Sequence, residues 1–560
     1  MTHITIDAKD VFVTEDLEFE IKIDNPYFSG TGSHSLEMEL PARPNTHIFS
    51  HAYRIDALKK EMKYPVSVMT DGHQVLSGTA VVTSYTEDSV KVQLVAGNAE
   101  LNFLAREDIF LDEVEWEMIH SLTGRMDGYE FITAYHGEEI ISDPDHYIDG
   151  RVVPRTFYPF VYMYHLVDLI LRKFGYSIGR SVLHTTWMRD ILCVCAFKKT
   201  AVNLGDGDIM TKYGISDTWA GLPHWSVKEF FINLEKFCGV TVYVDEKTRK
   251  VDIIPSAEFF SNNMTCITDV IDAYECNMQD EDSGNVTKGN LSFGSSGDGY
   301  NRLKKEIYLA AKKISFASEQ EMKTFWNGAS DDIRKSTLFS WSYHQYITVD
   351  GKLKEVNLLE DLVRDWSDDS AVELKITPVN LKYANVKLHY YGPLQEMLSF
   401  KVNMLVPYVR EVSSYATAAI KSLQDAIDGK ETVTEATKKS CMEVCLCRLL
   451  KYEDLSGTSY TCPWTYYDGK QPAAANAVQK IPGSLCLRST EKDSLGFIHR
   501  NITPINSNLS YKFSFCLNKL PDIRDIFMIH NQKFVAREIT IRVNKTGLDP
   551  VMEGEFYRIG

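Results

Sequence analysis

The first hundred residues alternate between apolar and polar positions with a period of two, which is typical of strands that bury one face. In LEFEIKID the apolar positions are Leu17, Phe19, Ile21 and Ile23. SLEMELP and SVKVQLVAG alternate in the same way through Leu36, Met38, Leu40, Val90, Val92 and Leu94. Asp71-Gly72 stands between two apolar runs, which predicts a tight hairpin. Several short strands at this spacing indicate a small barrel or sandwich.

A different pattern runs from Trp225 to Pro255. Ser226 followed by Glu229 is a capping box, and Trp225 with Phe230 has the spacing of a hydrophobic staple. The apolar face of the predicted helix consists of Val227, Phe230, Phe231, Leu234 and Phe237. Gly239 then ends the helix. Val240, Val242 and Val244, the turn EKTRK, and Val251 with Ile253 predict a β-hairpin. We expect a compact helix-on-hairpin module without reactive groups.

A weaker copy of this unit begins near Tyr158. The apolar face of its helix consists of Phe160, Met163, Val167, Ile170, Leu171 and Phe174. His165, Asp168 and Arg172 lie on the opposite, polar face, and His165 is most simply a surface residue. Gly175 ends the helix before a strand that starts with YSI. Together the two units indicate an α+β domain.

The second half of the chain returns to strand patterns, with one predicted interruption. The strands include Val386, Leu388 and Tyr390, then Tyr511, Phe513 and Phe515, and finally Ile539, Ile541 and Val543. Between them, Val412, Tyr415, Ala419, Leu423 and Ile427 share one helical face that ends at Gly429. Thr432 and Glu435 form another capping box, which opens a second helix through EATKKSCMEVCLCRLLK. We therefore expect a helical hairpin there.

The fold class that follows is α+β and mainly β. It has two tube-like β-barrel domains, inserted helix-plus-hairpin α+β domains and the helical hairpin. The expected boundaries are 1–110 for the N-terminal barrel, 111–154 for a loop-rich connection, 155–288 for the α+β domain, 289–408 for the second barrel region, 409–455 for the helical hairpin, and 456–560 for the C-terminal region completing that barrel.

Composition narrows the class of protein. An apolar content of 44% suits a globular chain, and 560 residues correspond to roughly three to four domains. The formal net charge of −17 argues against a protein that grips phosphate backbones, because that affinity comes from Lys and Arg. A conduit that DNA only passes through is compatible with an acidic surface. With no signal peptide and no run long enough to span a bilayer, we expect a soluble protein of the cytoplasm.

The 11 cysteines form no repeating framework, which favours free thiols in a reducing compartment. Cys441, Cys445 and Cys447 lie close together, with Cys462 downstream. On a helix only Cys441 and Cys445 would share a face, and zinc usually takes paired C-x₂₋₄-C elements. Buried thiols that pack as small apolar groups are the preferred interpretation over a metal site.

Other candidate sites fail on spacing. FGSSGDGYN, Phe293 to Asn301, lacks the Gly-Lys-Ser/Thr ending of a phosphate-binding loop, and Asp298 replaces the last glycine of G-x-S-x-G. Counting twelve residues from Asp280 or Asp143 reaches Leu291 or Pro154 instead of the glutamate of an EF-hand. FGSSGDGYN is interpreted as a flexible loop between strands. The segments after Asp280 and Asp143 are interpreted as solvated acidic loops, with adventitious calcium binding as the alternative.

Catalytic signatures are not found either. Asp368 with Asp369, and Glu360 with Asp361, are adjacent in sequence and show no sign of converging across a cleft as glycosidase acids do. The 15 histidines form no H-E-x-x-H motif. We therefore expect no enzyme activity, no catalytic or metal-binding residue and no cofactor.

One aromatic segment offers a different function. TCPWTYYDG, Thr461 to Gly469, carries Trp464, Tyr466 and Tyr467. Exposed rings of this kind could form a sugar-binding platform. An aromatic loop packed on a neighbouring domain is preferred, because Trp and Tyr commonly anchor interfaces.

The order of these elements resembles the baseplate or tail-hub proteins of tailed bacteriophages, whose relatives occur in contractile injection systems. The residues that carry the resemblance are FEIKIDNPYFSG, SLEMELP and WSVKEFFINLEKFCGVTVYVDEKTRKVDI. YPFVYMYHLVDLILRKFGYSI and HNQKFVAREITIRVNKTGLDPVMEGEFYRI more narrowly resemble structural proteins of phages and prophages of gut Bacteroidetes. The predicted helical hairpin departs from a minimal hub, and no spike or peptidase segment is recognised.

This resemblance implies a homotrimer in which two tube-like domains per chain build a pseudo-sixfold ring beneath the tail tube. The implied partners are the tail tube and distal tail proteins, the tape measure protein and tip spike or receptor-binding proteins, with DNA only as passing cargo and no integral membrane association. The implied location is the virion, assembled in the cytoplasm of a bacterial host. The alternatives are a carbohydrate- or receptor-binding tail-tip protein and a virion-associated hydrolase.

Overall fold

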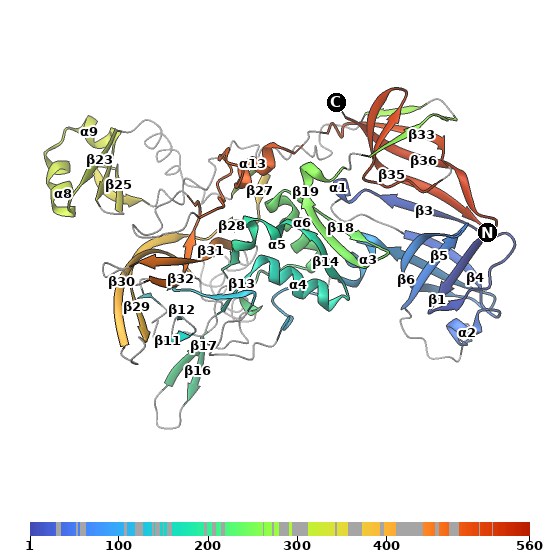
Figure 1. Ribbon diagram of the computed structural model, residues 1–560, viewed down its shortest axis with the longest axis horizontal. Helices are drawn as coiled ribbons and strands as arrows, with labels where there is room; N and C mark the ends of the chain where they lie inside the picture. The colour runs from blue at the N-terminus through green and yellow to red at the C-terminus, as the bar shows by residue number, and fades with distance from the viewer. Residues whose placement is uncertain are drawn as a thin grey trace, which may run out of the picture.

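The computed structural model shows a mainly β protein with its helices concentrated in the middle (Figure 1). It describes residues 1–29, 35–51, 54–55, 63–105, 109–117, 127–136, 139–140, 146–148, 151–153, 159–194, 199–203, 209–213, 219–260, 263–271, 274–278, 291–293, 312–341, 344–356, 372–391, 397–409, 441–453, 459–469, 481–502, 505–517 and 519–559.

The N-terminal sheet has six strands in the order β2-β1-β5-β6-β7-β4. Its elements are β1 (Thr2–Ile6), β2 (Lys9–Asp10), β4 (Ser35–Pro41), β5 (Lys63–Thr70), β6 (His73–Tyr85) and β7 (Ser89–Ala96). The predicted hairpin at Asp71-Gly72 is confirmed, since both residues have positive φ between β5 and β6. Three short helices accompany this part of the chain: α1 (Pro26–Ser29), α2 (Thr46–Phe49) and α3 (Gly97–Ala105).

The C-terminal sheet recruits a strand from the start of the chain. Its elements are β3 (Glu18–Asp24), β20 (Met264–Ile267), β21 (Glu275–Met278), β33 (Leu509–Cys516), β34 (Ile526–Ile529), β35 (Gln532–Asn544) and β36 (Leu548–Arg558). The predicted alternation of β3 is confirmed, because its apolar side chains are buried. Its partner is the distant β35, antiparallel over the whole strand.

This pairing differs from the composition expected for the second barrel. No described strand of residues 289–408 lies in the sheet of β33–β36. Alternation marks which face of a strand is buried but carries no information about its partner. The strands that complete this sheet come from residues 18–24 and 264–278 instead.

The C-terminal sheet is curled. Its strand order is β20-β34-β35-β36-β33-β21, so β20 and β21 lie at opposite ends of the order although they are neighbours in sequence. Ile267 ends β20 and Glu275 begins β21, and a connection this short spans roughly 25 Å at most. Between them, Val270 bridges Phe515 on β33. The part of the chain that contains β20 and β21 therefore pairs with both margins of the sheet, β20 with β34 and β21 with β33.

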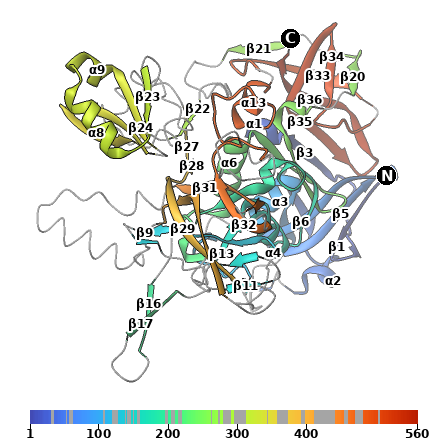
Figure 2. The same cartoon turned by 60° about the vertical axis from the view of Figure 1, so that its left-hand side comes forward.

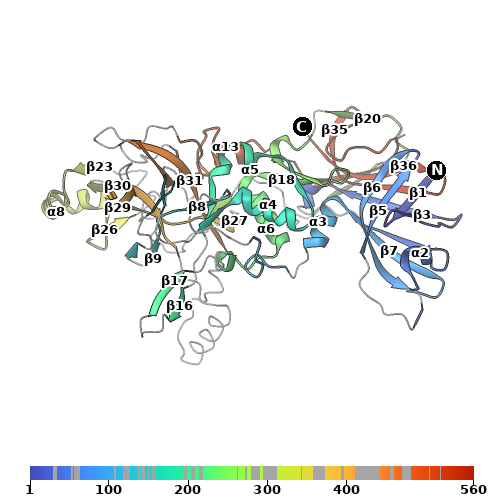
Figure 3. The same cartoon turned by 60° about the horizontal axis from the view of Figure 1, so that its bottom comes forward.

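The two sheets share one hydrophobic core. It contains Ile4, Val68 and Val92 from the N-terminal sheet, and Ile541 and Phe556 from the C-terminal sheet. Figures 1 and 3 show the sheets side by side at the end of the molecule that carries the N-terminus. The first and last parts of the chain thus form a single β body.

The middle of the molecule contains both predicted helix–strand units. They consist of α4 (Met163–Lys173) with β14 (Ser177–Ser181), and α6 (Val227–Cys238) with β18 (Val240–Asp245) and β19 (Lys250–Pro255). β14 and β18 flank β19 in one sheet, β14 parallel and β18 antiparallel to it. The helix at 163–173 starts later than expected, because Pro159–Tyr162 form strand β13.

The caps of α6 follow the prediction in part. The Ser226 hydroxyl accepts a hydrogen bond from the Glu229 amide at 3.1 Å, and Gly239 is left-handed with φ 62°. The Glu229 carboxylate binds the ammonium of Lys375 at 2.8 Å. In a complete capping box this carboxylate would instead accept a hydrogen bond from the Ser226 amide. Trp225 and Phe230 are both buried, as a staple requires.

An eight-stranded sheet packs beside these helices. It consists of β8 (Tyr129–Phe131), β11 (His146–Ile148), β12 (Arg151–Val153), β13 (Pro159–Tyr162), β15 (Ile191–Cys193), β28 (Ile376–Pro378), β31 (Met442–Glu453) and β32 (Ser459–Tyr466). The two short helices nearby are α5 (Val182–Thr185) and α13 (Leu495–Arg500). Side chains of this sheet and of α4 and α6 form one large core.

β31 overturns the second half of the predicted helical hairpin. Residues 442–453 are a strand, whereas the pattern favoured a helix through Lys451. Both faces are covered, since Cys445 and Cys447 are buried on one and Val444 and Leu446 on the other. A continuous apolar run of this kind does not reveal its period. The first helix and the Thr432–Glu435 cap lie outside the described residues.

A separate lobe within residues 289–408, where a second barrel region was expected, contains two helices as well as strands. It comprises β23 (Lys312–Phe316), α8 (Glu319–Gly328), α9 (Asp331–Ser336), β24 (Thr337–Trp341), β25 (His344–Val349) and β26 (Lys352–Val356). A usable signal existed, because Ser318 caps α8 by accepting from the Glu321 amide. Figure 2 shows the lobe standing apart from the body.

The remaining strands form pairs. They are β9 (Tyr135–His136) with β10 (Glu139–Ile140), β16 (Lys199–Asn203) with β17 (Ile209–Tyr213), β22 (Leu291–Phe293) with β27 (Val372–Leu374), and β29 (Leu381–Tyr391) with β30 (Met397–Pro407). The pair β16–β17 projects from the body in Figures 1 and 2.

Candidate functional site

The most concentrated buried charge lies where the turn between β18 and β19 meets α3. Glu100 is buried, and its carboxylate accepts hydrogen bonds from the hydroxyls of Thr79 at 2.6 Å and Tyr176 at 2.8 Å. Arg249 forms an ion pair with it at 3.1 Å and lies over the ring of Tyr176, 4.6 Å from the centroid. Four separate segments of the chain are therefore held together by one carboxylate.

Asn98 adds a second link at the same place. Its side-chain amide donates to the carbonyl of Val242 at 2.7 Å and accepts from the amide of Val244 at 2.9 Å. The asparagine thus satisfies backbone groups at the edge of β18 as a neighbouring strand would. These oriented polar contacts fix the β18–β19 hairpin to the N-terminal sheet and define the angle between the two.

A groove of 260 Å³ opens next to this junction. Its lining residues come from β3, α1, β6, α3, β18 with the turn that follows it, and the loop before β34: Ile23, Asp24, Pro26, Gln74, Val75, Leu76, Ser77, Gly97, Asn98, Tyr243, Val244, Asp245, Glu246, Lys247, Leu520, Pro521, Asp522 and Ile523. Four of them are acidic and Lys247 is the one cation among them. The groove is therefore unsuited to anions such as phosphate groups.

Glu246 is the titrating group of the groove. Burial raises the pKa of its carboxyl to about 7, and the nearby charges of Glu100 and Asp245 act in the same direction. A hydrogen bond from the Ser77 backbone opposes the shift. Gly97 allows the close approach, since a Cβ there would stand 3.1 Å from a Glu246 oxygen.

We expect Glu246→Gln to stabilise the protein at alkaline pH. A carboxyl whose folded pKa is raised contributes stability that is complete below its unfolded pKa and is lost as pH rises through the folded pKa. The variant should match the parent near pH 4 and exceed its unfolding free energy by roughly 2–4 kcal/mol at pH 8. Urea titrations at several pH values measure this. Exposed Glu87→Gln is the control, and a pH-independent difference would contradict the expectation.

Ser181, His184 and Asp168 are arranged like the residues of a hydrolase triad. Ser181 Oγ lies 2.8 Å from Nδ1 of His184, and Asp168 Oδ2 lies 3.1 Å from Nε2. The ring nitrogens are exchanged relative to serine hydrolases, in which the hydroxyl binds Nε2. Ser181 is 2% exposed, so its hydroxyl cannot meet a substrate. The three side chains join α4 to the short helix α5.

A fluorophosphonate probe should accordingly leave Ser181 unlabelled. Such reagents modify serine hydroxyls that are both activated and accessible, and this one is covered. Intact-mass spectrometry of the native protein measures the adduct, with trypsin in the same reaction as the positive control. Labelling that disappears in Ser181→Ala would establish a reactive serine and contradict this expectation.

His165 is not the surface residue that the helical pattern suggested. Its side chain is 12% exposed and lies 3.1 Å from a Glu117 carboxylate oxygen. Tyr129 stands edge-on to the ring and also donates to Glu117. Glu117 and Tyr129 therefore cover His165 on the polar face of α4, a long-range contact that helical periodicity does not encode.

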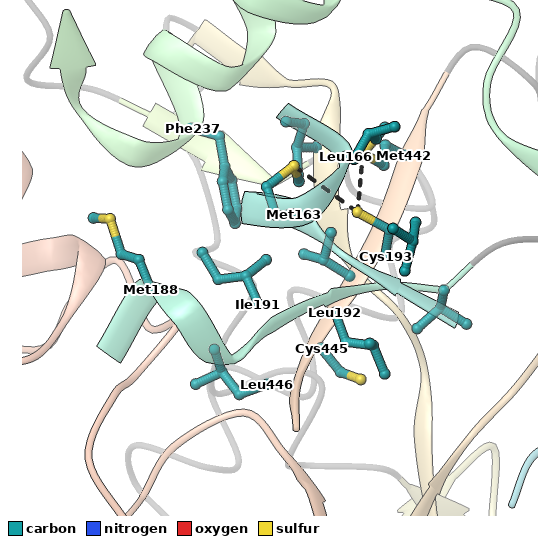
Figure 4. Packing of buried hydrophobic residues seen from close by; sticks show 14 of the residues in the cluster. Met163, Leu166, Met188, Ile191, Leu192, Cys193, Phe237, Met442, Cys445 and Leu446 are labelled. Carbon is teal, nitrogen blue, oxygen red and sulfur yellow. Dashed lines mark hydrogen bonds between the residues drawn. The ribbon is translucent and has the colours of Figure 1, made fainter. Parts of the chain in front are cut away.

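Two of the three cysteines of CMEVCLC, Cys445 and Cys447, are buried packing groups on strand β31, whereas Cys441 is half-buried and precedes the strand. Cys445 and Cys447 are buried, and burial raises the pKa of both thiols. Figure 4 shows Cys193 in the same cluster as Cys445, with its sulfur 3.9 Å from that of Met163 and 3.8 Å from that of Met442. Within the described residues no group of three or more His, Cys, Asp or Glu is placed to hold a metal ion.

The aromatic platform hypothesis is wrong for TCPWTYYDG. Trp464, Tyr466 and Tyr467 are at most 1% exposed, and the first two belong to β32. The Tyr466 hydroxyl donates to the Pro482 carbonyl at 2.9 Å, and the Tyr467 hydroxyl accepts from the Leu381 amide at 2.6 Å. The preferred interpretation, aromatic packing, is confirmed, with a strand in place of a loop.

Several predicted loops lie wholly or partly outside the described residues. Phe293 is described and buried at the end of β22, but residues 294–301 are not described. The acidic segments after Asp280 and Asp143 are mostly outside, and so are Glu360, Asp361, Asp368 and Asp369.

Sequence reasoning missed the junction of Glu100, Arg249 and Glu246. Each is an ordinary charged residue in its local pattern, and the three converge only through the packing of α3 on the hairpin. The one local hint was Gly97-Asn98 directly after an apolar strand, a pair typical of a turn or cap. Within the described residues, moreover, no helix has the length and apolar character needed to cross a membrane.

Comparisons with known proteins give distant likenesses. No family model matches the chain, and no curated protein matches it. Among solved structures, the 43 kDa tail protein of prophage MuSo2 from Shewanella oneidensis is 9% identical, with a TM-score of 0.32 over 99% of this chain and 96% of that one. A tail protein from Neisseria meningitidis MC58 is 7% identical, with a TM-score of 0.29 over 100% and 96%. Such values do not establish a shared fold or function.

Proposed function

We propose that this chain is a structural hub subunit in the tail or baseplate of a phage-like particle. The observation that carries the proposal is the β body, in which two sheets from the two ends of the chain share one core. One of these sheets is paired along both margins by a single segment, as a tube-like unit requires. The sequence resemblance to tail hubs points to the same architecture.

In this proposal the two sheets are the two tube-like domains. The second one is built from β3, β20, β21 and β33–β36, which replaces the expectation based on residues 289–408. Three copies would place six such units in a ring beneath a hexameric tail tube. The α4–α6 region, which lies beside the β body, and the β23–β26 lobe, which stands at the opposite end of the molecule in Figure 1, would then occupy the periphery.

The charge supports a passage for DNA. The surface of the second sheet carries a ladder of paired charges, in which Arg542 contacts Glu20 at 3.1 Å and Glu553 at 3.3 Å. Lys22 pairs with Glu538 at 2.8 Å. These cations are already matched by carboxylates, and the chain carries a formal net charge of −17. A wall of this kind neither binds nor retains a polyanion.

The proposed role is structural. The hydroxyl of Ser181, which lies beside His184, is covered. The aromatic rings proposed for sugar binding are part of the core. The proposed partners are further copies of this chain, the tail tube and distal tail proteins, the tape measure protein and tip spike or receptor-binding proteins, in a virion assembled in the bacterial cytoplasm.

Imaging of assembled particles tests the proposal. Particles purified from cells that express the complete tail gene set, with this chain tagged at a surface position, should show the tag in a ring at one end of the tail tube. Mass spectrometry of the same particles should give three copies per tail. Particles that lack the chain, or that carry a single copy, would refute the structural hub assignment.

A further inference from the structure

The turn between β18 and β19 lies between two separate hydrophobic cores. Val244 and Val251, on either side of the turn, belong to the core of the helical middle region. Leu76 of β6, which lines the same groove as the turn, belongs to the core of the β body. The backbone of Ser77 on β6 donates a hydrogen bond to the Glu246 carboxyl of the turn. A polar contact of this kind can open without disturbing either core.

The two ends of the turn are held by α3. Asn98 binds the backbone of β18 just before the turn, through both groups of its side-chain amide. Arg249, which follows the turn, pairs with Glu100 at 3.1 Å. Because these contacts do not involve β6, they can persist when the turn leaves β6. Movement of the turn relative to β6 is therefore confined to residues 245–248.

Residues 245–248 form a preorganised unit. The Asp245 carboxylate accepts hydrogen bonds from the Lys247 amide at 3.0 Å and from the Thr248 hydroxyl at 2.7 Å. Side-chain contacts of this type fix the shape of a turn. The turn can therefore move as one piece, and Glu246 is the residue through which it is hydrogen-bonded to β6.

Negative charges lie on most of the elements that are packed around Glu246. They belong to Asp24 of β3, Glu100 of α3, Asp245 of the turn and Asp522 of the loop before β34. The part of β6 that lines the groove, residues 74–77, is uncharged, and so is Pro26 of α1. Ionisation of Glu246 therefore adds a charge to a region that is already acidic.

The neighbouring cations offset this charge only weakly. Lys247 lines the groove but is exposed, so water screens its attraction. Three others are already paired with carboxylates: Arg249 with Glu100, Arg524 with Asp522 and Lys22 with Glu538. The hydrogen bond from Ser77 favours the ionised form, but burial outweighs it and raises the pKa of Glu246 to about 7.

The packed position of the carboxyl also prevents its hydration on one side. A Cβ atom added to Gly97 would stand 3.1 Å from a Glu246 carboxylate oxygen, so the side chain lies directly on the backbone at the start of α3. A water molecule cannot lie between the two. An ionised carboxylate recovers its full hydration only by leaving this position.

We propose that residues 245–248 are a pH-dependent latch over the groove. The latch lies closed on β6 while the Glu246 carboxyl is protonated, and it lifts from Ser77 when the carboxyl ionises. Lifting widens the groove and leaves the contacts of Asn98 and Arg249 with the hairpin in place. This inference goes beyond the proposed structural role and does not depend on it.

The direction of the pH effect follows from linkage. The Glu246 carboxyl has an ordinary pKa of 4.5 and a pKa of about 7 in the closed latch. Protonation therefore favours the closed latch fully below the ordinary pKa, and this advantage is lost as pH rises through the pKa of the closed form. Between pH 5 and pH 8, the equilibrium constant for opening should rise by at least about 30-fold.

Hydrogen–deuterium exchange of the full-length chain tests the latch. The reporter is the Ser77 amide, because the Glu246 carboxyl is its hydrogen-bond acceptor. Exchange is read by mass spectrometry with fragmentation of peptides from β6. The parent and Glu246→Gln are compared at the same pH, so that the intrinsic pH dependence of exchange cancels. Glutamine keeps an acceptor oxygen but cannot ionise. The parent-to-variant ratio of Ser77 exchange rates should therefore rise at least about 30-fold from pH 5 to pH 8.

Two controls separate the latch from general unfolding. The Val244 amide, which donates to Asn98 at 2.9 Å, belongs to the same hairpin and should show no such rise. Glu87→Gln, an exposed change in the turn after β6, should behave like the parent at both pH values.

Two results would overturn the inference. In the first, the ratio at Ser77 stays constant from pH 5 to pH 8, so ionisation of Glu246 does not move the turn. In the second, Ser77 and Val244 rise equally, which would show that the whole hairpin or the whole chain opens instead of residues 245–248.

Discussion

Trp225→Ala is expected to lower the free energy of unfolding by about 3–5 kcal/mol. Trp225 is among the largest fully enclosed side chains of the protein, at 2% exposure. It immediately precedes the Ser226 cap, and its carbonyl accepts a hydrogen bond from the Leu111 amide at 2.9 Å. Removing the indole leaves a cavity between the start of α6 and the segment 109–111, which the surrounding backbone cannot close.

Urea denaturation followed by far-ultraviolet circular dichroism measures this loss without depending on tryptophan fluorescence. Phe325→Ala is the control, because Phe325 is 40% exposed and belongs to the separate lobe. A loss below about 1 kcal/mol in Trp225→Ala would mean that the helix start does not depend on the staple. A variant that unfolds normally but fails to assemble would assign the residue to an interface.

Arg249→Met is expected to destabilise the protein by about 2–4 kcal/mol. The loss comes mainly from Glu100, whose carboxylate is 3% exposed and would lose its cationic partner. The hydroxyls of Thr79 and Tyr176 would remain as hydrogen-bond donors. The lower end of the range reflects Arg249 itself, whose side chain is 42% exposed.

A double-mutant cycle with Glu100→Gln separates this effect from lost packing. Glutamine has nearly the shape of glutamate without its charge, so the Arg249→Met penalty should shrink by about 1–3 kcal/mol in the Glu100→Gln background. Arg249→Lys tests whether charge alone is sufficient or whether the planar group over Tyr176 is required. An Arg249→Met penalty that is equal in both backgrounds would show that the ion pair contributes nothing.

Local structure was readable from the sequence wherever one face of an element met the core and the other met solvent. The strand at Leu17–Ile23, the hairpin at Asp71-Gly72 and the helix after Ser226 all have this property. β31 does not, because Cys445 and Leu446 are buried on opposite faces of it. A segment covered on both sides loses the polar positions that reveal its period, and a helix was predicted there.

The site was harder to predict than the fold. Thr79, Glu100, Tyr176 and Arg249 are separated by up to 170 residues and have no motif in common. Their association depends on how α3, the N-terminal sheet and the β18–β19 turn pack. The Ser181–His184–Asp168 set illustrates the opposite problem, since the residue types suggest catalysis and only burial excludes it.

The pairing of β3 with β35 has a consequence for synthesis. A ribosome completes residues 18–24 near the start of translation and residues 532–544 near its end, so β3 waits for its partner until almost the whole chain has been made. Sheets that depend on such distant pairs fold slowly, and their edge strands stay unpaired until the partner strand has been made. A prematurely terminated product cannot finish the β body, which excludes incomplete chains from any larger structure that requires it.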